Sequence, residues 1–158
     1  MLARFLRMEW VPASSDAALL VLRIVVPGSL FLKHGLEKLF TFSTMASHFP
    51  NPLHIGVIPS LLFATLSDGI CMPLLMLGLA ARWAAVWSFI NLFVAWAFVH
   101  HFQFFGRGGD HGELIVVYLG VLATLFIAGP GRFSIDGWIG RRRAVGREES
   151  HPHPAILK

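Results

Sequence analysis

The sequence predicts an all-α, polytopic membrane protein: a bundle of four transmembrane helices with both ends of the chain in the cytoplasm. Of its 158 residues, 55% are hydrophobic and only 14% are charged, whereas a soluble domain carries about a quarter charged residues. The charges also collect at the ends, because residues 17–131 hold only nine of the 22 Asp, Glu, Lys and Arg side chains. That middle region contains four apolar stretches of about the length that crosses a bilayer.

This composition excludes several classes of protein. The middle of the chain has too little polar surface to cover a water-soluble globule, which excludes a soluble enzyme, a disordered chain and a nucleic-acid-binding domain despite the net charge of +4. The single cysteine, Cys71, excludes a disulfide framework, a CxxC redox pair and a zinc-thiolate site. We therefore interpret the basic residues as topology signals and expect the lipid bilayer, not nucleic acid, as a partner.

The first two spans have recognisable beginnings. The first, about 17–40, follows the Ser-Ser-Asp run at 14–16, and these residue types cap helices. The second, about 59–80, opens with Pro59, whose missing N–H costs little at the first helical position. The connection between them is rich in turn formers, so we expect a loop at the membrane interface.

The last two spans are bounded by short connections. The third covers about 83–105, which leaves only residues 81–82 for a tight antiparallel hairpin with the second. The fourth covers about 113–128 and is stopped by Gly-Pro-Gly at 129–131.

The distribution of Lys and Arg predicts the orientation. With the N-terminus inside, nine of these residues lie on the cytoplasmic side and only Lys38 and Arg107 on the outer side. We expect a cytoplasmic segment at 1–16, a four-helix domain at 17–131 and a cytoplasmic basic tail at 132–158. In the tail, Ile135, Trp138 and Ile139 have helical spacing before a run of three arginines. This pattern indicates a short interfacial helix on anionic lipid, or simply a topology signal.

Ionisable residues inside the spans are the candidates for function, because each is costly in a bilayer unless it is paired or hydrated. Counting ~1.5 Å per residue from the inner ends places four groups from three helices in the outer half of the membrane. We expect Arg23 to extend its side chain to the inner interface instead. The candidates other than Arg23 are Lys33, His34, Glu37, Lys38, Asp68, His100, His101 and Glu113.

Asp68 needs a cation or its own proton at mid-membrane. By depth Lys33 is the best-matched cation, and Lys38 is the other candidate. Alternatively, Asp68 is a neutral carboxyl that is hydrogen-bonded to His34 or Asn91. Because Pro73 cannot bond to the carbonyl four residues earlier, we also expect a kink beside Asp68.

The outer polar residues suggest a ligand. A quinone headgroup needs only a histidine or carboxylate nearby to exchange protons, and His34, His100 and Glu113 supply both. We do not expect a haem or metal site, because no HxxxH spacing lies within one helix. The alternative is that these groups form a buried ion and hydrogen-bond network that only fixes helix register.

The order and spacing of several short motifs resemble the DoxX family of small four-helix membrane proteins. The resemblance extends from Leu22 to Trp138, and the main departure is Asp68, where the family usually has Glu. The motifs are Leu22-Arg23, His34-Gly35 with Lys38, Phe49-Pro50-Asn51-Pro52-Leu53, Leu77-Gly78-Leu79 with Arg82 and Ala84, Val94-Ala95 with His100, Glu113, and Gly129 to Asp136.

The resemblance implies a bacterial inner-membrane protein associated with redox complexes. It implies that a quinone or redox-partner site opens outward, and that Arg82 holds the hairpin turn. The expected roles are Asp68 as the buried carboxylate, Lys33 or Lys38 as its countercharge, and His34, His100 and Glu113 as proton-handling groups. Lys33, Glu37, Lys38 and His101 would contact the cofactor.

We therefore expect the membrane subunit of a quinone-linked oxidoreductase system. Its electrons must come from a redox protein partner, because the chain has no CxxC, no dinucleotide glycine motif and no flavin site. The alternatives are a non-catalytic membrane scaffold for an oxidoreductase and a small permease. The permease ranks lowest, because four short helices without a repeat leave little room for alternating access. Whether the chain is itself an enzyme, and whether it forms a homo-oligomer, stay open.

Overall fold

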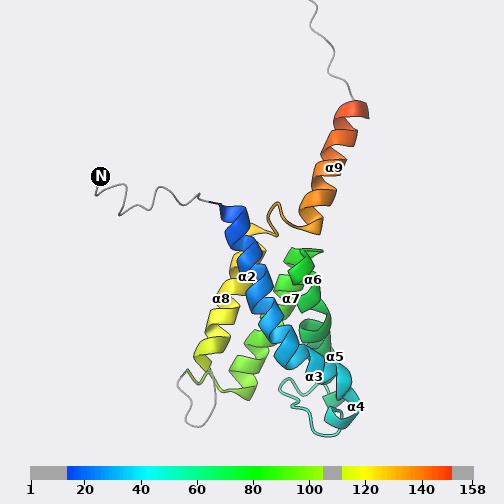
Figure 1. The fold of residues 1–158 in the computed structure, drawn as a ribbon. Coiled ribbons are helices and arrows are strands. Elements are labelled where there is room, and N and C mark those ends of the chain that lie inside the picture. Colours follow the sequence, from blue (N-terminus) through cyan, green and yellow to red (C-terminus); the bar gives the residue numbers. More distant parts are fainter. Residues whose placement is uncertain (1–13, 105–111, 151–158) are drawn as a thin grey trace, which may run out of the picture.

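A computed structural model describes residues 14–104 and 112–150, with the backbone alone from 145 onward, and every regular element in these ranges is helical. Three long helices each combine α-helical and π-helical parts, and they are joined by short turns and one longer loop (Figure 1). The elements are α2 (Ser15–Leu30), η1 (Phe31–Gly35), α3 (Leu36–Phe40), α4 (Phe42–Met45), α5 (Val57–Thr65), η2 (Leu66–Cys71), α6 (Met72–Leu77), α7 (Ala81–Val94), η3 (Ala95–Val99), α8 (Gly112–Ala128) and α9 (Ile135–Ser150).

The helices agree with the expected spans except at one end. Ser15–Phe40, Val57–Leu77 and Ala81–Val99 are long and apolar enough to cross a membrane, and Gly112–Ala128 is a shorter apolar helix. The third span ends at Val99, earlier than expected, because the next turn adopts left-handed backbone conformations at His101 and Phe102. Hydropathy does not report such a turn, since the residues beyond it are also apolar.

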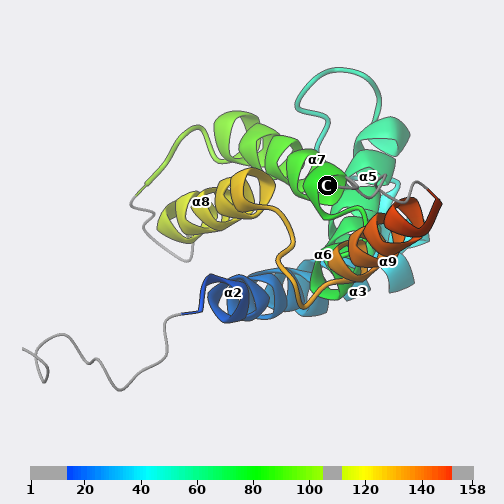
Figure 2. The same cartoon turned by 90° about the horizontal axis from the view of Figure 1, so that it is seen from above.

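The core lies where α2, α6, α7 and α8 meet (Figure 2). The buried face of α7 carries only small residues, namely Ala81, Ala84, Ala85 and Ser88, at intervals of three and four. Small side chains let helix backbones approach closely, which is how helices pack where the hydrophobic effect is weak. Larger side chains from neighbouring helices fill the space, and these include Leu30, Met72, Leu75, Leu122 and Leu125.

One end of the bundle, here called the basic end, holds the start of α2, the α6–α7 turn, the 129–134 loop and the start of α9 (Figure 1). Arg23 is 1% exposed, and its guanidinium donates to the carbonyls of Pro130 and Phe133. The Arg23 side chain therefore extends toward the basic end, the direction that we expected, but its guanidinium is buried beneath the 129–134 loop. It is held there because the loop after α8 offers carbonyls that no helix satisfies.

The start of α9 is tied to the hairpin between α6 and α7. The carboxylate of Asp136 accepts hydrogen bonds at 3.0 Å from the backbone N–H groups of both Ala80 and Ala81. It thus caps the first turn of α7, whose N–H groups have no partners within the helix. The hairpin is short, as expected, but its turn lies at residues 78–80 and not at 81–82, which are the first two residues of α7. Arg82 therefore does not hold the turn, and its side chain donates to the carbonyl of Ile127 at 3.4 Å. Helix α9 is longer than the short interfacial helix that we expected.

Candidate functional site

A buried ion pair lies at the opposite end of the bundle, here called the pocket end. The Nζ atom of Lys38 is 2.9 Å from Oδ2 of Asp68, and the two side chains are only 10% and 6% exposed. Asp68 therefore has a countercharge, but it is Lys38 and not the depth-matched Lys33, which is exposed. Depth along the helix does not specify the face, and a lysine side chain is long enough to reach a carboxylate more than one turn away.

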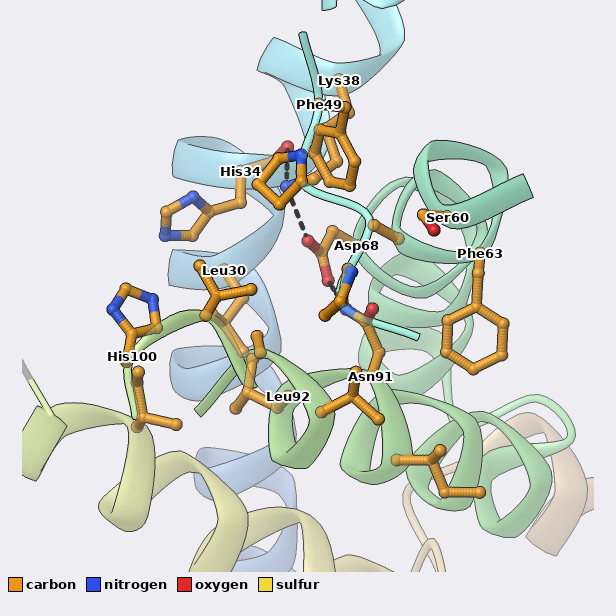
Figure 3. A pocket seen from close by; sticks show the side chains of 18 of the residues that line it. Leu30, His34, Lys38, Phe49, Ser60, Phe63, Asp68, Asn91, Leu92 and His100 are labelled. Carbon is orange, nitrogen blue, oxygen red and sulfur yellow. Dashed lines mark hydrogen bonds and ion pairs between the residues drawn. The ribbon is translucent and has the colours of Figure 1, made fainter. Parts of the chain in front are cut away.

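Two further donors converge on the same carboxylate. The hydroxyl of Ser67 donates to Oδ1 of Asp68 at 2.9 Å, and the side-chain amide of Asn91 donates to the same oxygen at 3.3 Å. The Nζ atom of Lys38 also donates to the carbonyl of His34 at 3.5 Å. Asp68 thus receives an ammonium, a hydroxyl and an amide, which is the environment that a carboxylate requires away from water. Figure 3 shows the contacts of Asp68 with Lys38 and Asn91.

Each of the three long helices becomes π-helical beside this ion pair. The N–H of Leu36 bonds to the carbonyl of Phe31, that of Met72 to Ser67, and that of His100 to Ala95. These bonds span five residues, so each segment is wider than an α-helix and rotates the side chains that follow it. Such π-helical turns are rare and occur frequently at functional sites. The irregularity that Pro73 predicts next to Asp68 is present as segment η2.

The close approach of the first and second spans depends on a glycine. A Cβ atom on Gly35 would lie 2.3 Å from the backbone carbonyl oxygen of Asp68 and 2.8 Å from the ring of Phe31. Only glycine lets these two π-helical segments touch, and their contact places Lys38 opposite Asp68. A glycine beside charged residues in an apolar helix is the sequence signal for such a contact.

The ion pair forms part of the wall of a cavity of about 540 Å³. This volume falls within the range of small-molecule sites. The wall is mainly apolar, and besides the ion pair it carries the polar side chains of His34, Ser60, Asn91 and His100 (Figure 3). The apolar wall comes from all four spans and from the first loop, and it includes Leu30, Phe49, Pro50, Pro52, Leu53, Ile55, Phe63, Ala64, Ile90, Leu92, Val94, Ala95, Val99, Leu114 and Ile115.

The first loop is held over the cavity by Asn51. Its side-chain oxygen accepts hydrogen bonds from the N–H of Gly56 at 3.1 Å and from the hydroxyl of Ser60 at 3.2 Å. The motif that contains Asn51 therefore has a structural task, which is to carry Phe49, Pro50 and Pro52 to the mouth of the cavity. Sequence reasoning treated this stretch only as an interfacial loop.

The structure brings together five of the eight candidate site residues. Lys33, His34, Lys38, Asp68 and His100 line the cavity. In contrast, Glu37, His101 and Glu113 are exposed and do not line it. Sequence reasoning did not identify Ser60, Ser67 and Tyr118 as polar lining or partner groups, although Ser67 is adjacent to Asp68 in sequence.

No group of three or more His, Cys, Asp or Glu side chains in residues 14–104 and 112–144 is arranged to hold a metal ion. Asp110 and His111, in the connection between the third and fourth spans, lie outside the described residues.

The family model named DoxX matches residues 18–101, which is more than half of the chain. The chain belongs to the DoxX family. The matched region includes the first three spans and with them Lys38, Asp68, Asn91 and His100, so the ion pair and most of the cavity lie within the family domain. No curated protein and no solved structure matches the chain. With its apolar helices, this DoxX chain is a membrane protein.

Proposed function

We propose that this DoxX protein is the membrane subunit of a quinone-linked oxidoreductase system and that the cavity at the pocket end binds the quinone headgroup. The observation that carries the proposal is the Lys38–Asp68 ion pair in the wall of a mainly apolar cavity. Small-molecule sites have this character: apolar walls with a few polar groups that set the orientation of the ligand.

The cavity fits a quinone in its polarity. A quinone ring carries two carbonyl acceptors, and Lys38 and Asn91 offer N–H donors beside the cavity. Exposed apolar residues also line it, with Ile55 at 55%, Ile90 at 46% and Val99 at 37% exposure. In a membrane these side chains face lipid, so an isoprenoid tail can leave the cavity without entering water.

The residues of the cavity can serve the proton side of the reaction. A quinone, when bound, accepts two electrons and two protons. His34 and His100 line the cavity and are the residue type suited to proton transfer near neutral pH. The Asp68 carboxylate fixes the position of the Lys38 ammonium, whose positive charge favours electron density on the nearest ring oxygen.

The electrons come from a redox protein partner, because the chain has one cysteine and no flavin or dinucleotide motif. The proposal places the chain in a bacterial plasma membrane with the basic end in the cytoplasm, as the distribution of Lys and Arg predicts. Under this orientation the cavity lies in the outer half of the bilayer.

The test is quinone binding by the purified full chain in lipid nanodiscs. Short-chain analogues of ubiquinone and menaquinone are titrated, and the rise in unfolding temperature is measured. At about 100 times the dissociation constant, binding adds roughly 2.7 kcal/mol of stability. Ala95→Phe puts a ring into the cavity wall and should abolish the rise, whereas Ala128→Phe, on an exposed position outside the cavity, should preserve it. Equal rises in all three proteins would mean partitioning into lipid and would contradict the proposal.

One observation favours a second candidate, the non-catalytic scaffold. Both oxygens of Asp68 are satisfied by groups of the chain itself, as in a network that only locks helix register. In the redox system, His34→Ala should leave folded protein in the membrane yet abolish quinone-dependent turnover, and Asp68→Asn should abolish the turnover of whatever protein stays folded. Loss of the protein itself from the membrane, with no quinone effect on the wild type, would favour the scaffold.

A further inference from the structure

An open groove crosses the basic end, where α6 ends and α9 begins. Its apolar residues include Leu77, Phe133 and Trp138, and its cations are Arg132 and Arg141. The three apolar side chains are 55%, 61% and 49% exposed, respectively. Large exposed apolar residues beside arginines mark a surface that contacts another molecule.

The groove lies at the boundary of the membrane. Leu77 is the last residue of the candidate span Val57–Leu77, so the apolar part of the groove adjoins the hydrocarbon region. Arg132 follows the apolar helix α8 after a short turn, and its backbone N–H is held by the carboxylate of Asp16 at 2.8 Å. Trp138 is the residue type that membrane proteins concentrate at the headgroup level.

Within residues 14–104 and 112–144, neither arginine of the groove forms an ion pair with an acidic side chain. The nearby carboxylates of Asp16 and Asp136 instead accept hydrogen bonds from backbone N–H groups. Arg141 uses one N–H to donate to the carbonyl of Arg132 at 3.1 Å, which holds the two arginines together and leaves its other donors available. Both arginines are exposed.

We propose that this groove binds an acidic phospholipid. The phosphate contacts Arg132 and Arg141, and the acyl chains lie against Leu77, Phe133 and Trp138. Arginine guanidinium groups match the geometry of phosphate oxygens, and the apolar residues match the adjoining chains. An RNA or an acidic protein segment would use the charges but not an apolar surface that continues into the bilayer. The proposal is independent of the quinone and of the orientation of the chain.

The test compares the full-length protein in nanodiscs of pure phosphatidylcholine and in nanodiscs that contain phosphatidylglycerol or cardiolipin. The acidic lipids should raise the unfolding temperature, and acidic lipid should stay bound in native mass spectrometry. Arg132→Gln and Arg141→Gln should each weaken lipid retention by about fivefold, the effect of one cation near an anionic surface. Arg143→Gln is the matched control, because Arg143 is exposed on the same helix and does not line the groove.

The unfolding temperature in pure phosphatidylcholine separates a loss of lipid binding from a loss of folding. A variant that is simply less stable has a lower unfolding temperature in phosphatidylcholine as well as in the acidic lipids. Equal losses of retention for all three variants would show a diffuse attraction and overturn the proposal. So would RNA binding with no preference for acidic lipid.

Discussion

At the scale of single residues, Asp68 both forms the buried ion pair and lines the cavity. Its carboxylate is paired with Lys38 at 2.9 Å and accepts hydrogen bonds from Ser67 and Asn91. A buried ion pair is costly to desolvate, and replacing both partners with uncharged residues is often neutral or stabilising. A contribution to stability alone therefore does not explain why the chain has this ion pair. Its position in the cavity wall supports a role in ligand binding.

This argument predicts the behaviour of a double-mutant cycle. Asp68→Asn leaves the Lys38 ammonium unpaired, and Lys38→Met leaves the Asp68 carboxylate without its cation, so each should cost about 3–5 kcal/mol. The double variant has no charge at either of these two positions and should be more stable than either single variant. The free energy of unfolding is measured in mixed detergent micelles. Additive losses would show that the two side chains act independently, contrary to the ion pair described above.

At the scale of elements, the π-helical segments set the shape of the cavity. Segments η1 and η2 touch at Gly35, and η3 lies on the third span beside the same cavity. An α-helix through any of these segments would rotate the following residues to other faces. The site therefore depends on backbone irregularity at three places that are far apart in sequence.

The contact at Gly35 can be tested with two glycine substitutions. Gly35→Ala places a Cβ atom 2.3 Å from a backbone oxygen that cannot move freely, and such overpacking costs about 1–3 kcal/mol. Gly120→Ala is the control, because nothing lies within 4 Å of the added atom. It should raise stability by up to about 1 kcal/mol through helix propensity. Unfolding measurements that show the same sign for both substitutions would contradict the close contact of η1 and η2.

The cap that α9 provides to α7 makes a separate prediction. Asp136→Ala removes the acceptor for the N–H groups of Ala80 and Ala81 and should destabilise the protein by about 1–2 kcal/mol. Asp136→Asn keeps one acceptor oxygen and should lose less. The unfolding temperature should be highest for the wild type, lower for Asp136→Asn and lowest for Asp136→Ala. An unfolding temperature of Asp136→Ala equal to that of the wild type would exclude the cap.

At the scale of the whole molecule, the two ends of the bundle differ in character. The pocket end holds the cavity and its ion pair, and the basic end holds the arginine-lined groove. Arg23 and Asp136 tie the basic end together through backbone groups. Under the two proposals made above, the pocket end binds the quinone and the basic end binds an acidic phospholipid.

The helical spans were predictable from sequence because hydropathy and span length are local properties, and the structure has apolar helices in all four places. The residue that pairs with Asp68 could not be predicted in the same way, because the pairing depends on helix face and side-chain length and not on depth alone. The burial of Arg23 beneath the 129–134 loop and the contribution of the first loop to the cavity wall also depend on contacts between distant segments. Of the candidate residues, Glu37, His101 and Glu113 do not line the cavity, because the position of a residue along its helix does not determine the face on which its side chain lies.

The measurement that tests the central claim most directly is photo-crosslinking with an azido-quinone in nanodiscs, followed by peptide mapping. We predict labels on residues that line the cavity, near 30–38, 63–68 and 90–100, and their loss with excess unlabelled quinone or in Ala95→Phe. Labels confined to lipid-facing positions such as Val117 and Ile127, unaffected by competition, would contradict a quinone site in this cavity.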